Sequence, residues 1–81
     1  MGEPDIKAWV EAMGRDLVDR PGAVEVSAFE EEGVTVFELK VDPPEVGRVI
    51  GRQGRTAQAL RTLLEAAGAR HGKYYDIEIV D

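Results

Sequence analysis

The length, composition and charge of the chain set the first limits on what it does. With 81 residues it has room for one domain with one core, which we place at residues 1–81. Hydrophobic residues make up 43% and charged residues 32%, which predicts a folded chain rather than a disordered one. The chain has no cysteine, which excludes a disulfide framework, a thiolate metal site and a cysteine nucleophile.

Charge is distributed unevenly along the chain, although the net charge of −6 argues at first against a nucleic-acid ligand. Residues 1–46 carry 4 basic and 12 acidic side chains. Residues 47–73 reverse this balance, with 6 basic side chains and 1 acidic one. A basic segment inside an acidic protein steers a polyanion to one face. The alternative is that these arginines only occupy the solvent-exposed face of a helix.

The sequence predicts a soluble, cytoplasmic protein that does not bind membranes. Residues 1–5 carry no basic-then-apolar signal segment. No apolar run approaches the roughly 20 residues that span a bilayer. The lack of cysteine fits a reducing compartment.

The first half of the chain predicts one helix followed by two strands. Apolar residues recur at helical spacing after Pro4, and residues 20–22, which contain proline and glycine, are expected to stop this helix. Residues 23–29 and 34–41 are rich in β-branched side chains, which predicts strands joined by a turn at 30–33.

The second half predicts two helices and a last strand. Asp42 is expected to cap a short helix, and Glu45 to reach back to its start in a capping box. Gly51 ends this helix. Residues 54–67 form a longer amphipathic helix, and residues 74–80 form the last strand. The order α-β-β-α-α-β predicts an α+β fold, with a three-stranded sheet whose one face is covered by the helices.

The loop between the two later helices carries the features of an anion site. Gly51 and Gly54 have no Cβ, so a phosphate can approach their main chain closely. The second helix begins at this loop and directs free N–H groups and the positive end of its dipole toward it. Arg52 and Arg55 add charge that suits phosphate, and Gln53 adds a hydrogen-bonding amide.

Apolar residues beside the loop suggest a place for bases. If Val46, Val49 or Ile50 lines a groove, bases lie against it while phosphates follow the loop. Single-stranded RNA is read in this manner, because its bases can be splayed out and their edges reached.

These residues resemble a known family. Residues 49–54, with the sequence VIGRQG, resemble the V-I-G-x-x-G signature of KH domains. The predicted element order resembles the prokaryotic, type II KH topology. The length, the entry at residues 42–43 and the run of residues 54–57 are similar to those of the KhpA family of small bacterial single-KH proteins.

The resemblance implies a function and partners. In KH domains the loop clamps the backbone of about four nucleotides. Family members act as RNA chaperones or global RNA binders, are linked to cell division, cell shape and envelope control, and pair with themselves or with a larger KH protein, KhpB (also called Jag). The residues that the resemblance and the basic charge assign to RNA are Gly51, Arg52, Gln53, Gly54, Arg55, Arg48, Val49 and Ile50.

Simpler interpretations stand beside these. In the simpler interpretation of the loop, it is a connection between two helices in which the glycines only relieve backbone strain. A Walker-type phosphate loop is not supported, because no Gly-Lys-Ser/Thr follows. Trp9 lies on the apolar stripe, which favours core packing over base stacking, and His71 has no second ligand nearby to suggest a metal or catalytic role.

Two hypotheses of function from different classes remain, and the hypothesis of an enzyme is the weakest. The leading hypothesis is a single-stranded RNA binder. The alternative is a protein-interaction adaptor or dimerisation module with little RNA binding of its own. No cofactor is expected, and the lone serine, Ser27, lies in a predicted strand beside no obvious base.

Overall fold

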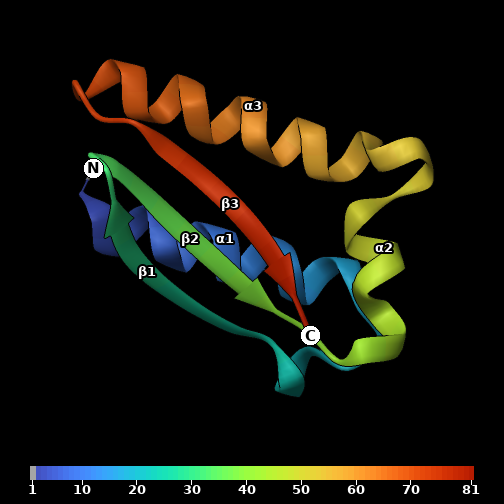
Figure 1. Ribbon diagram of the computed structural model, residues 1–81. Coiled ribbons are helices and arrows are strands. Elements are labelled where there is room, and N and C mark those ends of the chain that lie inside the picture. Colours follow the sequence, from blue (N-terminus) through green and yellow to red (C-terminus); the bar gives the residue numbers. More distant parts are fainter. Residues whose placement is uncertain (1) are drawn as a thin grey trace.

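The computed structural model describes residues 2–81, which form two layers (Figure 1). Met1, which we placed in the domain, lies outside the described residues. The α-helices are α1 (Glu3–Leu17), α2 (Val46–Ile50) and α3 (Arg55–Arg70), and the strands are β1 (Glu25–Glu31), β2 (Val34–Lys40) and β3 (Tyr75–Val80). Short 3₁₀ turns occupy Pro21–Ala23, Pro43–Glu45 and Arg52–Gly54.

The three strands form one mixed sheet in the order β1-β2-β3. β1 and β2 pair as an antiparallel hairpin, and β3 lies parallel to β2. The predicted α+β class, the element order and the three-stranded sheet are therefore confirmed. α1 and α3 cover one face of the sheet, and α2 lies at the end where β2 and β3 finish (Figure 1).

Alternation along the strands explains which face the helices cover. Phe37 and Leu39 of β2 are fully buried, and their neighbours on β3, Ile77 and Ile79, point to the same side. Ile6 and Val10 of α1, with Leu60 and Leu64 of α3, complete this core. A Cβ on Gly14 would meet Leu39 Cδ1 at 2.8 Å, so a residue without a side chain lets α1 approach the sheet.

Several boundaries differ from the sequence prediction. α1 ends at Leu17, three residues before the expected stop, and the segment with Pro21 forms its own 3₁₀ turn, so β1 starts at Glu25. The hairpin turn is shorter than predicted, because Glu32 (φ 52°) and Gly33 (φ 81°) both adopt the left-handed conformation. Two such residues give a tight turn whose twist matches the strands, so β1 continues to Glu31.

Within residues 2–81, no helix combines the length and the apolar character needed to cross a bilayer.

Candidate nucleic-acid interface

Gly51 turns the chain at the end of α2, and no other residue type fits there. Its φ of 80° lies in the region that disfavours side chains. A Cβ would also overlap Thr56 Oγ1, and would lie 2.7 Å from Thr56 Cβ and 2.9 Å from its backbone nitrogen. The start of α3 is therefore packed directly against the Gly51 backbone.

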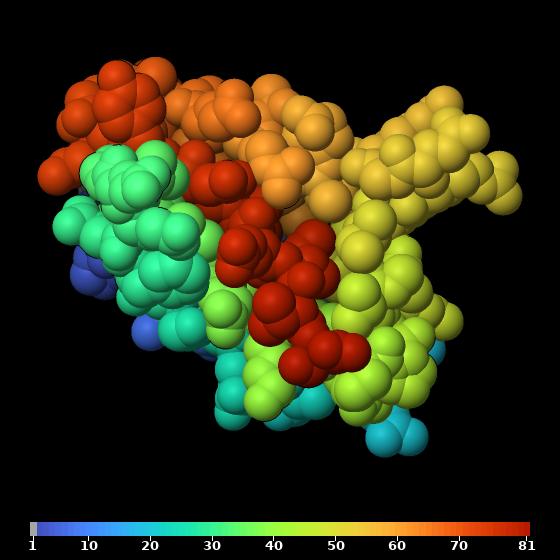
Figure 2. Space-filling model, in the orientation of Figure 1, coloured from blue at the N-terminus to red at the C-terminus, as the bar shows by residue number. Residues whose placement is uncertain are grey.

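The rest of the loop is turned outward. Gln53 (φ 57°, ψ 25°) and Gly54 (φ 72°) both adopt left-handed conformations, and no atom lies within 4 Å of where a Gly54 Cβ would be. α3 starts at the next residue and runs for 16 residues. Figure 2 shows the yellow segment that joins α2 to α3 standing out from the body of the molecule. Backbone at the start of a long helix is thus open to a ligand.

The polar side chains of the loop are exposed. Arg52, Gln53 and Arg55 all lie at the surface. Arg55 Nη2 donates to Gln53 Oε1 at 3.1 Å, which orients the two side chains together. Among the described residues no hydrogen bond or ion pair engages the Arg52 side chain, so its guanidinium is free to meet an anion.

A groove of about 540 Å³ runs beside the loop, between the start of α3 and strand β3. Ile50, whose side chain is 37% exposed, lies at one side of it. The other lining residues are Ala57, Arg61, Ile77, Glu78, Ile79 and Val80. The sequence analysis did not assign any of these others to the site. The helical spacing of Ala57 and Arg61 marks one face of α3, but only the fold shows that β3 lies opposite it.

Two of the residues expected at the RNA site, Val49 and Arg48, do not line this groove. The Val49 side chain is 0% exposed and packs in the core, so it cannot line an accessible groove. Arg48 Nη1 pairs with Asp19 Oδ1 at 3.0 Å, in a depression formed with Asp42 and Glu45 rather than in the groove beside Ile50. Consecutive residues of an α-helix point about 100° apart around its axis, which explains why Arg48, Val49 and Ile50 of α2 face three different directions.

The capping roles predicted for Asp42 and Glu45 are wrong. Neither side chain caps its helix. Glu45 is buried, and its carboxylate accepts hydrogen bonds from the backbone N–H groups of Asp19 and Arg20. Asp42 instead pairs with Arg20 at 3.5 Å. These contacts tie the segment after α1 to the start of α2, and so help to position the helix that leads into the loop.

Arg61, which lines the groove, is held in place by Asp76 of β3. Arg61 Nε lies 2.8 Å from Asp76 Oδ1, and the same oxygen accepts the backbone N–H of Ile77 at 2.8 Å. Burial by itself raises the pKa of Asp76, but the hydrogen bonds from Arg61 and Ile77 and the charge of Arg61 hold that pKa below its ordinary value of 3.8. Asp76 is therefore a carboxylate at neutral pH.

Comparison with known proteins identifies the family. The family model described as "KhpA/KhpB, KH domain" matches residues 7–79, which is nearly the whole chain. The chain belongs to this family. The run VIGRQG noted in the sequence forms the end of α2 and the turn that follows it, in which Gly51, Gln53 and Gly54 have positive φ.

Relatives of the KhpA/KhpB family match the chain over nearly all its length. It is 47% identical to the RNA-binding protein KhpA of Aquifex aeolicus over 76 residues, which cover 94% of this chain and 96% of the relative. It is 46% identical to the RNA-binding protein KhpA of Treponema pallidum over 79 residues, covering 98% and 95% of the two chains. A third RNA-binding protein KhpA, from Caldanaerobacter subterraneus, is 45% identical over 71 residues, covering 88% and 95%.

Proposed function

We propose that residues 1–81 act as one KH module that binds single-stranded RNA, with the sugar-phosphate backbone on the Gly51–Gly54 loop and the bases in the groove beside it. The observation that carries this proposal is the exposed, left-handed loop at the start of α3, next to a groove with an apolar floor. The relatives are named RNA-binding proteins, which supports it.

The chemistry divides between the two parts of the site. The loop supplies bare backbone at Gly51 and Gly54 and the positive end of the α3 dipole, and Arg52 and Arg55 supply guanidinium groups. Ile50 and Ala57 supply an apolar surface on which bases lie. A phosphate-dominated contact of about four nucleotides predicts modest affinity that falls as salt is raised.

The decisive experiment reverses the charge of the loop. In Arg52→Asp with Gln53→Asp, we expect RNA affinity to fall by at least about tenfold, because two carboxylates repel the phosphates that the loop would hold. Aspartate tolerates the left-handed conformation at position 53, so the fold should persist. Gel shift or fluorescence anisotropy with short RNA measures the first effect, and circular dichroism the second.

A matched control separates local repulsion from net charge. Lys7→Asp with Ala8→Asp makes the same change of charge at two exposed positions of α1. We expect this control to retain most of its affinity. Equal losses in the two variants, or no loss in the loop variant, would contradict the proposal.

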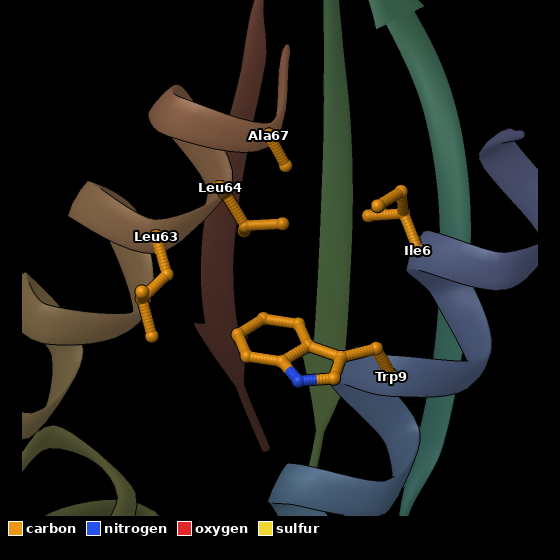
Figure 3. Close-up of a pocket in the computed structure, with 5 residues that line it drawn as sticks. All are labelled: Ile6, Trp9, Leu63, Leu64 and Ala67. Carbon is orange, nitrogen blue, oxygen red and sulfur yellow. The ribbon is translucent and has the colours of Figure 1, made fainter. Parts of the chain in front are cut away.

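We further propose that the chain works in the cytoplasm as an RNA chaperone and associates with a second KH chain, either a second copy or the larger KhpB. An apolar groove between α1 and α3 supports the association (Figure 3). Trp9 of α1 extends across it toward α3, and Leu63 of α3, which also lines it, is 52% exposed. An apolar side chain this exposed on a small domain suits a protein contact. The same groove is the feature that favours the adaptor alternative.

A further inference from the structure

The outer edge of β3 forms one wall of the groove. The backbone N–H and C=O groups along this edge can form directional hydrogen bonds with a ligand in the groove. β3 is the last strand of the sheet, so only one of its edges pairs with β2. The carbonyls of Tyr74 and Val80 accept hydrogen bonds from β2-side amides of Thr35 and Val41. Backbone groups alternate in direction along a strand, so the N–H and C=O of Ile77 and Ile79 point away from the sheet. These groups are obligatory hydrogen-bonding groups that need a partner or solvent.

Side chains occupy both outward groups of Ile77. Its N–H donates to Asp76 Oδ1 at 2.8 Å, and its carbonyl accepts from Arg61 Nη2 at 3.3 Å. Arg61 also holds the Asp76 carboxylate through Nε, so the three residues form one closed set of hydrogen bonds. This set lies one helical turn beyond Ala57, at the inner end of the groove.

In the described part of the chain, the outward backbone groups of Ile79 have no side-chain partner, unlike those of Ile77, although both residues face the same way. Within residues 2–81, no hydrogen bond engages its N–H or its carbonyl. Its side chain is half-buried and contributes to the groove, two residues closer to the loop-proximal end of β3 than Ile77. One adjacent donor and acceptor on an apolar floor match the edge of a base, which also offers a donor beside an acceptor.

We propose that Asp76 and Arg61 set the inner end of the RNA groove, because they occupy the N–H and carbonyl of Ile77, the other outward-facing residue of β3 that lines the groove. The inference rests on the proposed RNA binding. It makes Asp76 and Arg61 positioning residues that limit how many bases contact the β3 edge. Of the two outward-facing residues of β3 that line the groove, Ile77 and Ile79, it leaves only Ile79 with a free N–H and carbonyl.

A variant that leaves the net charge unchanged tests whether Arg61 and Asp76 limit the number of bases in the groove. Arg61→Met with Asp76→Ala removes one positive and one negative group, keeps the apolar stem at position 61, and exposes both Ile77 groups. Wild-type affinity for homo-oligoribonucleotides should rise with length up to about four nucleotides and then level off. In the variant we expect levelling about one nucleotide later, with affinity for the longer RNA about threefold to tenfold higher than wild type.

A second ion pair provides the control. Glu11 and Arg15 of α1 lie 2.8 Å apart and are also partly exposed, so Glu11→Ala with Arg15→Met removes an equivalent pair away from the groove. This control should keep the wild-type length dependence. If the Arg61/Asp76 variant levels off at the same RNA length as wild type, the inference is overturned.

Amide hydrogen exchange tests the geometry without RNA. In the free wild-type protein, the Ile77 amide should exchange roughly tenfold more slowly than the Ile79 amide, because only Ile77 has an acceptor. In the Arg61/Asp76 variant the two rates should become similar. Equal rates in wild type would overturn the inference even if RNA binds, whereas a wild-type protein that protects Ile77 but binds no RNA would overturn the proposed function instead.

Discussion

Gly51 is the residue on which the shape of the loop depends most. Its positive φ and its contact with Thr56 each exclude a side chain, and together they bring the end of α2 against the start of α3. The neighbouring Gly54 has a positive φ but open space around it, so its requirement is conformational only. The two glycines of one motif therefore serve different physical purposes.

Replacing Gly51 should disturb folding, whereas a nearby glycine should not. For Gly51→Ala we expect a loss of about 2–4 kcal/mol in the free energy of unfolding, from left-handed strain and from overlap with Thr56. Gly47→Ala is the matched control, because Gly47 lies within α2 with no atom near its missing Cβ. That control should gain up to about 1 kcal/mol. Urea denaturation of both variants measures the difference, and equal stabilities would contradict this account.

The residue types in the sequence predicted the chemistry of the loop better than they predicted which way each side chain points. The glycines and arginines of the loop were identified from their pattern, and the loop is exposed as an anion site requires. Val49 and Ile50 are equally apolar neighbours, yet one is in the core and the other faces the groove. Glu45 looked like a helix cap because its partners, the amides of Asp19 and Arg20, lie more than twenty residues away in the sequence.

At the scale of elements, β3 and α3 together form the groove wall. The Arg61–Asp76 pair joins them where the groove ends, and its side chains are 39% and 45% exposed. Such a pair contributes little to stability at the surface, where water screens it. Its larger effect is to occupy the backbone N–H and carbonyl of Ile77.

The Arg61–Asp76 pair should make the stability of the fold depend on pH. Because the pKa of folded Asp76 lies below its ordinary value, its carboxylate stabilises the fold at higher pH, and this contribution is lost as the pH falls through the folded pKa. We expect the difference in unfolding free energy between wild type and Asp76→Ala to be constant above about pH 5 and to shrink below about pH 4. Urea denaturation across this range measures it.

Arg61→Met provides the internal comparison for this dependence. Arg61 contributes both a hydrogen bond and a charge to the lowered pKa, so Asp76→Ala should show a weaker pH dependence in the Arg61→Met background than in wild type. The same dependence in both backgrounds would show that Arg61 does not lower the pKa of Asp76.

Elements were predictable where periodicity was strong. The stripe of α1 and the alternation of β2 and β3 were recognised because each matches the period of one structure. Boundaries were less predictable, since α1 ends at Leu17 without a glycine or proline there, and the hairpin turn depends on the left-handed conformation of Glu32, a residue type that rarely adopts it.

At the scale of the whole molecule, the basic segment does not act as one surface. Arg48 and Arg61 are each paired with a carboxylate, while Arg52 and Arg55 remain exposed on the loop. Arg70 and Lys73 are also exposed, but they lie at and beyond the far end of α3, so the positive charge next to the groove is concentrated at the loop. This concentration is how a chain with a net charge of −6 is compatible with a polyanion.

The apolar groove between α1 and α3 gives a prediction about assembly. Leu63→Glu should shift wild-type self-association toward monomer, because it places a charge in an interface that would have to exclude water. The fold should persist, since the side chain is 52% exposed. Sedimentation velocity at several concentrations measures the shift.

A charge control on the same helix completes that experiment. Gln58→Glu adds the same charge at an exposed position of α3 outside the groove of Figure 3, and should leave association unchanged. A wild-type protein that stays monomeric at all concentrations would contradict the homodimer and leave the heterodimer with KhpB as the partner to examine by co-purification.

The sequence by itself determined the fold class, the order of elements, the family and the position of the glycine loop, because these follow from periodicity and from residues adjacent in the chain. Only the tertiary structure decided which residues share a surface with that loop. It turned Val49 inward, drew Arg48 to Asp19, and placed Ile79 and Arg61 along the same groove as Ile50. The physical reason is that a groove is formed by elements distant in sequence, and their meeting depends on how helices pack on a sheet rather than on any local pattern.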